Sequence, residues 1–214
     1  MNRIQIIQSL IDKNNYKSYL EIGVQAGHCF KTIICDNKVG VDPDINSAAT
    51  HHMSSDDFFE TFLKYQQKPA FIKDEKGTRE ISVPEKYDIC FSDGLHHAPQ
   101  SERDILNMLD VLNDGGVIVC HDMLPNSKRM QEIPLQEQNE WCGNVWLSWV
   151  KLRMTRPDLE MVCINTDWGT SLIKKGKQEV LKTSLDLSYE NFEIHKHEWM
   201  NIISVDQFKA RYLD

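Results

Sequence analysis

The sequence predicts an α/β fold in which a doubly wound, mostly parallel sheet carries an antiparallel edge strand. Short apolar strands alternate with helical segments along most of the 214 residues, which is the pattern of βαβ units. In addition, residues 19–42 contain a strand, a glycine turn and a second strand that ends in an acid, an order typical of nucleotide-type cofactor folds. A chain of this length suits one domain spanning residues 1–214.

The N-terminal half supplies the first elements of this fold. Apolar residues every three or four positions predict a helix within residues 1–17. An N-cap at Ser54 followed by acids predicts another helix after a short β-type run. The remaining elements expected here are strands over 18–23, 38–42 and 47–53 and a helix over 27–35.

The C-terminal half continues the alternation after an interruption. Two β-type runs around Lys76-Gly77 predict a hairpin insertion over residues 67–86. Residues 176–214 form a C-terminal extension with enough apolar side chains to be ordered against the domain or a second subunit. Between them we expect strands over 87–93 and 117–120, helices over 100–112 and 141–154, and two antiparallel edge strands over 159–164 and 170–173.

Composition excludes several classes of protein. A net charge of −8 without a lysine or arginine stripe argues against nucleic-acid partners bound through the phosphate backbone. No apolar run approaches the roughly 20 residues of a membrane span, and the first residues lack the apolar region of a signal peptide. The six cysteines show no C-x-x-C spacing and suit reduced core thiols. We therefore expect a cytoplasmic protein without a membrane partner.

The glycine turn indicates which cofactor to expect. Gln25 stands where a dinucleotide fingerprint needs its middle glycine, so the turn between Gly23 and Gly27 is a poor site for a pyrophosphate. Glu21 would repel a phosphate but attract an ammonium group. A zwitterionic ligand therefore fits better, with Asp42 available to ribose hydroxyls.

Further motifs carry a family resemblance over most of residues 19–174. They are Glu21-x-Gly23-x-x-x-Gly27, Val41-Asp42-Pro43-Asp44, residues 53–59, Asp93-Gly94-Leu95-His96-His97 with Arg103-Asp104-Ile105, residues 115–122 with Pro125, Gly143-Asn144-Val145-Trp146 and Asp167-Trp168-Gly169. Together they resemble the class I S-adenosylmethionine-dependent methyltransferases, in the branch of polysaccharide and natural-product O-methyltransferases. The resemblance implies a single Rossmann-like methyltransferase domain. Asn144 and Ser92 depart from the branch, which more often has an acid and an apolar residue there.

The resemblance also implies where the cofactor lies. The backbone at Gly23 and Gly27 would hold its methionine part, and Asp42 its ribose hydroxyls. Ser55 and Asp56 would lie beside the adenine. The full set expected at S-adenosylmethionine is Glu21, Gly23, Gly27, Asp42, Ser55, Asp56 and Asp93.

Methyl transfer to a hydroxyl needs alignment and a base. His96, with Asp93, is the expected catalytic pair, because histidine titrates near neutral pH. Related O-methyltransferases hold a divalent ion after the fourth and fifth strands, which are expected here over residues 87–93 and 117–120. The resemblance therefore implies Asp93, His121 and Asp122 as metal ligands. Oxygen ligands favour Mg²⁺, and His121 would tilt the site toward a softer metal. A His121 that bonds only a loop carbonyl is the alternative.

The expected activity is S-adenosylmethionine-dependent O-methylation of a small-molecule or saccharide hydroxyl. Two alternatives stay open at this point: a non-catalytic, cofactor-binding partner subunit of the same fold, and a nucleotide-cofactor oxidoreductase. A homo-oligomer is also open, and the sequence does not identify the methyl acceptor.

Overall fold

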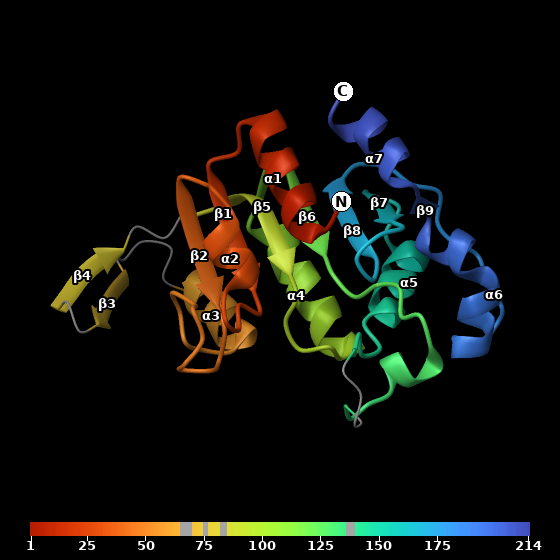
Figure 1. Cartoon of the computed structure of the whole chain (residues 1–214), viewed down its shortest axis with the longest axis horizontal. Coiled ribbons are helices and arrows are strands. Elements are labelled where there is room, and N and C mark those ends of the chain that lie inside the picture. Colours follow the sequence, from red (N-terminus) through yellow and green to blue (C-terminus); the bar gives the residue numbers. More distant parts are fainter. Residues whose placement is uncertain (65–69, 75–76, 82–84, 136–139) are drawn as a thin grey trace.

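The computed structural model describes residues 1–64, 70–74, 77–81, 85–135 and 140–214, and a seven-stranded sheet lies at its centre (Figure 1). The strand order is β2-β1-β5-β6-β8-β7-β9. All neighbours are parallel except β8, which runs antiparallel to β6 and β7. The predicted fold class is confirmed. The strands are β1 Ser18–Ile22, β2 Asn37–Val41, β5 Tyr87–Ser92, β6 Leu112–Cys120, β7 Leu159–Ile164, β8 Thr170–Lys175 and β9 Ile202–Ile203.

Helices cover both faces of this sheet and divide the core into two layers. One layer packs under α1 (Arg3–Asn14), α2 (His28–Thr32) and α7 (Val205–Tyr212). The other packs under α3 (Ser55–Lys64), α4 (Ala98–Asp110), α5 (Trp146–Thr155) and α6 (Tyr189–Met200). The strands alternate their side chains between the layers: Tyr19 faces α1 and α2, whereas Leu20 faces the opposite helices. A 3₁₀ turn, η1, spans Lys128–Gln131.

The strand expected over residues 47–53 does not form, and this prediction is wrong. A single bridge joins His51 to Val41. The Thr50 hydroxyl instead donates to the Gly40 carbonyl and accepts from the Gly40 N–H, both at 3.0 Å. Such side-chain bonds to the backbone compete with strand pairing, and they fold the segment over the end of β2.

Inside the predicted insertion, β3 (Ala70–Asp74) and β4 (Gly77–Ile81) pair antiparallel in a separate two-stranded sheet. Residues 65–69, 75–76 and 82–84 of that region lie outside the described residues. The single domain and the limits of its insertion and extension stay predictions.

Several element limits differ from the expected ones. Helix α2 ends at Thr32 rather than Cys35, and β6 begins at Leu112 rather than Val117, with an irregular register beside β5. Helix α5 begins at Trp146 rather than Trp141. Residues 141–145 instead turn toward the loop that follows β5, so they become part of the candidate site.

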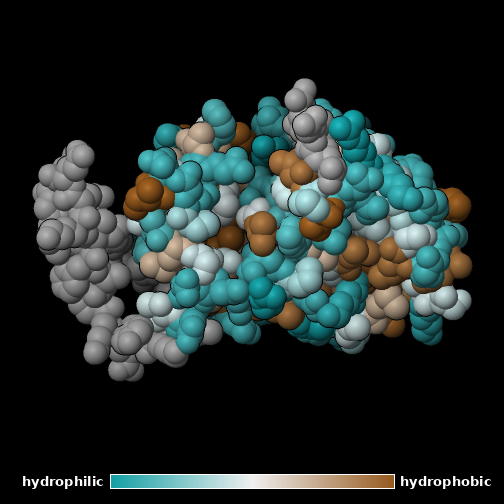
Figure 2. All heavy atoms as spheres, turned by 90° about the horizontal axis from the view of Figure 1, so that it is seen from below, coloured by the Kyte–Doolittle hydropathy of each residue, from teal (hydrophilic) through white to brown (hydrophobic). Residues whose placement is uncertain are grey.

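The parallel strands point the same way in Figure 1, so their carboxyl ends share the lower side of the molecule. Figure 2 looks onto that side, where hydrophilic side chains predominate and hydrophobic ones gather toward α5 and α6. In open α/β sheets, ligands bind outside the carboxyl ends of the strands. Among the helices in the described ranges, none is both long and apolar enough to cross a membrane.

Candidate active site

The glycine turn after β1 brings two loops into contact. Gly23 has a φ of 88°, and its N–H donates to the Val41 carbonyl at 2.9 Å. A Cβ at this position would lie 2.0 Å from the Asp93 carbonyl oxygen, so only glycine lets the β1 and β5 loops approach this closely. Gly27, with a φ of 80°, begins α2. Both predicted cofactor glycines therefore lie at the carboxyl edge of the sheet.

Asp42 directly follows β2, is buried and binds the backbone of the same glycine turn. Its Oδ2 accepts hydrogen bonds from the Val24 N–H at 3.0 Å and the Gln25 N–H at 2.8 Å. Its Oδ1 accepts one from the Asp44 N–H at 2.9 Å. A carboxylate offers about four acceptor positions, so three described bonds leave room for one ribose hydroxyl rather than two.

Glu21 is buried inside the sheet rather than exposed to a cleft. It is 1% exposed on the face of β1 that α1 and α2 cover, and its Oε2 accepts a hydrogen bond from the Tyr19 hydroxyl. Burial raises the pKa of Glu21 to about 7, although the Tyr19 hydrogen bond opposes the rise. Its role toward an ammonium group stays a prediction.

Ser55 and Asp56, the residues expected beside the adenine, begin α3, where side chains from α4 hold them. The Gln100 amide donates to the Ser55 hydroxyl at 3.1 Å and to Asp56 at 3.0 Å, and Arg103 pairs with Asp56 at 3.2 Å. Gln100 also bonds the buried Asp104 at 3.0 Å. The first turn of α3 is thus fixed at the edge of the sheet where the resemblance implies it.

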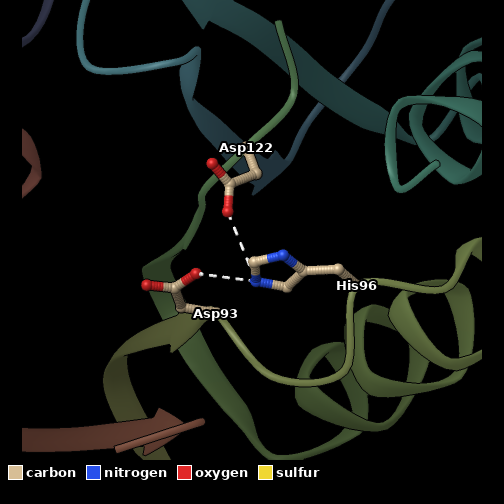
Figure 3. A group of neighbouring side chains, drawn as sticks. All are labelled: Asp93, His96 and Asp122. Atoms are coloured by element: carbon tan, nitrogen blue, oxygen red, sulfur yellow. Dashed lines mark ion pairs between the residues drawn. The ribbon is translucent and has the colours of Figure 1, made fainter. Parts of the chain in front are cut away.

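Three side chains converge at the ends of β5 and β6 (Figure 3). The Nε2 atom of His96 lies 3.5 Å from Asp93 Oδ1 and 3.3 Å from Asp122 Oδ2. Asp122 has a left-handed φ of 61°, which is a strained backbone of the kind that clusters at functional sites. The predicted catalytic residues His96 and Asp93 therefore meet.

The His96 ring is oriented from outside the cluster. Its Nδ1 lies 3.1 Å from the Trp141 carbonyl, which can only accept, so Nδ1 carries the proton. Nε2 then has the lone pair that faces the carboxylates in the neutral ring. The Trp141 ring also lies against His96, with 5.0 Å between centroids.

Residues 143–144 fix the loop that carries His96. A Cβ at Gly143 would lie 1.9 Å from the His96 carbonyl oxygen, and the Asn144 N–H donates to that oxygen at 3.2 Å. The Asn144 side chain accepts from the Ala98 N–H at 2.7 Å, which satisfies a free donor at the start of α4. Asn144, which departs from the related branch, therefore has a structural role at the start of α4.

The charges within the cluster change the proton affinities. Burial alone would lower the pKa of His96, but the hydrogen bond to Asp93 and the charge of Asp122 raise it. Burial likewise opposes ionisation of Asp93, yet His121 and His96 together hold the pKa of Asp93 below its usual range. The cluster therefore favours a charged Asp93 carboxylate and raises the proton affinity of His96.

His121 lies on the far side of the same carboxylates. Its Nδ1 is 3.4 Å from Asp93 Oδ1 and 3.3 Å from Asp122 Oδ2 but makes no hydrogen bond within the described residues. Its Nε2 lies 2.9 Å from Arg3 Nη1 and 3.6 Å from Asp167 Oδ1. Burial would lower the pKa of His121 and the surrounding carboxylates raise it, whereas the Arg3 contact requires a lone pair on Nε2. His121 Nε2 is therefore the acceptor in the Arg3 contact, because two donors cannot face each other at that distance.

The donor set fits a divalent ion. Asp93, His96 and Asp122 each offer a ligand atom, and these atoms lie within 4.8 Å of one another. Two carboxylates and one imidazole suit Mg²⁺ or Mn²⁺, with the nitrogen favouring the softer ion. In this set His96 takes the place that the sequence assigned to His121. Ligation by Asp93, His121 and Asp122 stays a prediction.

Two contributors to the site were missed in the sequence. Arg3 comes from the first turn of α1, far along the chain from its partners, and no local pattern marks it. Asp167 belongs to the motif Asp167-Trp168-Gly169, in which the sequence suggests a substrate-facing position for Trp168 and no role for Asp167. The position of Asp167 two residues before Gly169, in the turn between β7 and β8, was the sequence feature that could have marked it.

Known proteins with a similar sequence or fold are methyltransferases. Residues 20–123 match the family model described as a methyltransferase domain. A search of curated proteins found no match. Similar solved structures include a putative O-methyltransferase from Klebsiella pneumoniae, with 13% identity, a TM-score of 0.55 and coverage of 81% of this chain and 80% of that chain. The Bacillus cereus O-methyltransferase in complex with SAH (S-adenosylhomocysteine) has 13% identity, a TM-score of 0.53 and coverage of 81% and 80%. TomG from Streptomyces achromogenes, in complex with SAM (S-adenosylmethionine), has 15% identity, a TM-score of 0.52 and coverage of 80% and 78%.

The sheet order and the glycine turn define an α/β protein of the cofactor-binding kind. The family match over residues 20–123, together with this sheet order, supports the predicted class of S-adenosylmethionine-dependent methyltransferases.

Proposed function

We propose that this methyltransferase methylates a hydroxyl group of a small molecule or saccharide, with His96 as the base. The supporting observation is that the Trp141 carbonyl holds His96 Nδ1 at 3.1 Å and so presents Nε2 toward Asp93 and Asp122. In the reaction, the acceptor oxygen attacks the sulfonium methyl, the carbon–sulfur bond breaks with its electrons going to sulfur, and the hydroxyl proton passes to His96 Nε2. The products are a methyl ether and S-adenosylhomocysteine.

A divalent ion belongs to this proposal as a second component. Asp93 and Asp122 would hold it, and its charge would lower the pKa of a nearby hydroxyl. His96 has one lone pair on Nε2, so it either ligates the ion or accepts the proton, and not both at once. A cytoplasmic location, the absence of nucleic-acid and membrane partners and a homo-oligomeric state also stay proposals.

Binding and turnover test the proposal separately. S-Adenosylhomocysteine should raise the melting temperature and NAD should not, because only a ligand of the native state stabilises it. Methyl transfer from labelled S-adenosylmethionine is then measured over a panel of sugars, phenols and hydroxylated natural products. Stabilisation by NAD alone would favour an oxidoreductase, and cofactor binding without any methylation would favour a non-catalytic subunit.

Chelation tests the metal. If a divalent ion aligns the acceptor, excess chelator should abolish turnover and added Mg²⁺ or Mn²⁺ should restore it. Full turnover in chelator would remove the ion from the mechanism and leave His96 as the base.

A further inference from the structure

Arg3 is the one cation that the described structure places in contact with both His121 and the carboxylates around it. Its Nη1 lies 2.9 Å from His121 Nε2, and its Nε lies 3.9 Å from Asp93 Oδ2. The guanidinium carries five donors, no acceptor and a permanent charge. His121 Nε2 must therefore be the acceptor in this contact.

The first turn of α1 is anchored so that Arg3 stays in place. Asp167 accepts the Arg3 backbone N–H at 2.7 Å and the guanidinium Nη1 at 3.1 and 3.2 Å. A carboxylate at a helix N-terminus is favourable because the backbone N–H groups there have no partner within the helix. The Thr166 hydroxyl adds a hydrogen bond to the Met1 carbonyl.

The β7–β8 turn that contains Asp167 is also tied to the loop after β6, which carries His121 and Asp122. The Leu124 N–H donates to the Trp168 carbonyl at 2.8 Å, and a Cβ on Gly169 would lie 2.6 Å from the Leu124 nitrogen. Asp167 and Trp168 keep left-handed φ angles of 47° and 52°. Such strain persists only where the surroundings fix the backbone, and here they fix the carboxylate that holds Arg3.

We propose that Arg3 is a positioning residue of the site: by donating to His121 Nε2 it places the His121 proton on Nδ1, where it faces Asp93 and Asp122. The His121 Nδ1 proton then faces these two carboxylates at 3.4 and 3.3 Å, and Nδ1 is not available to a metal ion. The competing arrangement protonates Nε2, pairs it with Asp167 at 3.6 Å and leaves Nδ1 free as a ligand. The shorter Arg3 contact favours the first arrangement. This inference rests on the proposed function only where it treats the site as an active site. The position of the His121 proton does not depend on that function.

Nitrogen NMR reads the His121 tautomer directly, without acceptor or cofactor. Long-range ¹H–¹⁵N spectra of the histidine rings are recorded at neutral pH, and His121 is assigned by its loss in His121→Gln. We expect a protonated Nδ1 and an unprotonated Nε2 in the wild-type protein. A His121 protonated on Nε2, or on both nitrogens, would overturn the proposal.

Variants of Arg3 test the cause of this tautomer. Arg3→Gln should move the His121 proton largely to Nε2. Arg3→Lys should do so in part, because lysine keeps the charge but lacks the fork that reaches two partners. Arg3→Lys also decides the matter if Arg3→Gln does not fold.

Lys13→Gln, at the other end of α1, is the matched control and should leave the spectrum unchanged. A wild-type tautomer in every folded Arg3 variant would overturn the role of Arg3. A failure to methylate any acceptor would count against the proposed function and leave these spectra unaffected, so the two can be separated.

Discussion

Asp42 belongs to the cofactor half of the candidate site, the residues around the β1 turn that we expect to bind the cofactor, and it accepts three backbone hydrogen bonds at 2.8 to 3.0 Å. The reaction half is the cluster in which we expect the chemistry. There, Asp93 and Asp122 face two histidine nitrogens at 3.3 to 3.5 Å, and His121 Nδ1 has no hydrogen bond within the described residues. The cofactor half is therefore shaped before any ligand arrives. The buried polar groups of the reaction half are paired at longer distances, and such groups are costly unless a function needs them.

The difference has a structural origin. Asp42 is held by loops next to it in the fold, after β1 and β2, whereas the reaction half collects residues from β5, β6, α1 and the β7–β8 turn. Each of these elements brings a charge of its own. Changes in the reaction half should consequently affect turnover, and changes in the cofactor half should affect binding and stability.

The largest expected effect is on turnover. His96→Ala should lower the rate of methyl transfer by about 10²- to 10⁴-fold, the usual contribution of a positioned base. Its affinity for S-adenosylhomocysteine, measured by calorimetry, should change little. His97→Ala is the control, since His97 is the N-cap residue before α4 and its side chain makes no cap hydrogen bond. Equal rates for His96→Ala and the wild type would show that the reaction half needs no base at this position.

The second effect is a pH-dependent stability in the β1 region. The pKa of Glu21 rises from its ordinary value of 4.5 to about 7 in the folded protein, chiefly through burial. The folded state therefore binds this proton more tightly, so its stabilising effect is complete below pH 4.5 and is lost as the pH rises toward 7. The loss amounts to about 3 kcal/mol at most.

Urea unfolding of Glu21→Gln and the wild type on both sides of this pH window measures the effect. The wild type should lose stability relative to Glu21→Gln as the pH rises, and Glu198→Gln, an exposed change on α6, should show no such difference. A constant difference between wild type and Glu21→Gln would mean that Glu21 is not buried as described. Calorimetry with S-adenosylhomocysteine on the same variant tests its predicted cofactor role.

The sequence predicted the sheet because strand and helix patterns are local and strong. It also predicted that Asp93, His96, His121 and Asp122 share one edge, because carboxyl ends of neighbouring parallel strands meet there. Their detailed partners were not predictable. The choice between His96 and His121 as a ligand depends on Trp141 and Arg3, which lie far away in the chain.

The strand that was predicted over residues 47–53 and does not form has a similar explanation. Its composition suits a strand, but the Thr50 hydroxyl bonds Gly40, and that contact exists only once β2 has formed. Tertiary contacts of this kind override local propensity.

The smallest expected effect concerns Asp42. It tests directly whether the cofactor half of the site acts through binding and stability. In Asp42→Asn, the amide oxygen can still accept from Val24 and Gln25, but the NH₂ group then faces the Asp44 N–H, so one donor loses its acceptor. We expect a loss of about 1–3 kcal/mol in unfolding free energy, the usual cost of a buried donor left without a partner. Affinity for S-adenosylhomocysteine should fall by a similar free energy, since the charged acceptor for the ribose is lost. Asp44→Asn, a change in the exposed loop, should affect both quantities less. If Asp42→Asn lowered stability and left affinity unchanged, Asp42 would shape the turn without touching the ribose.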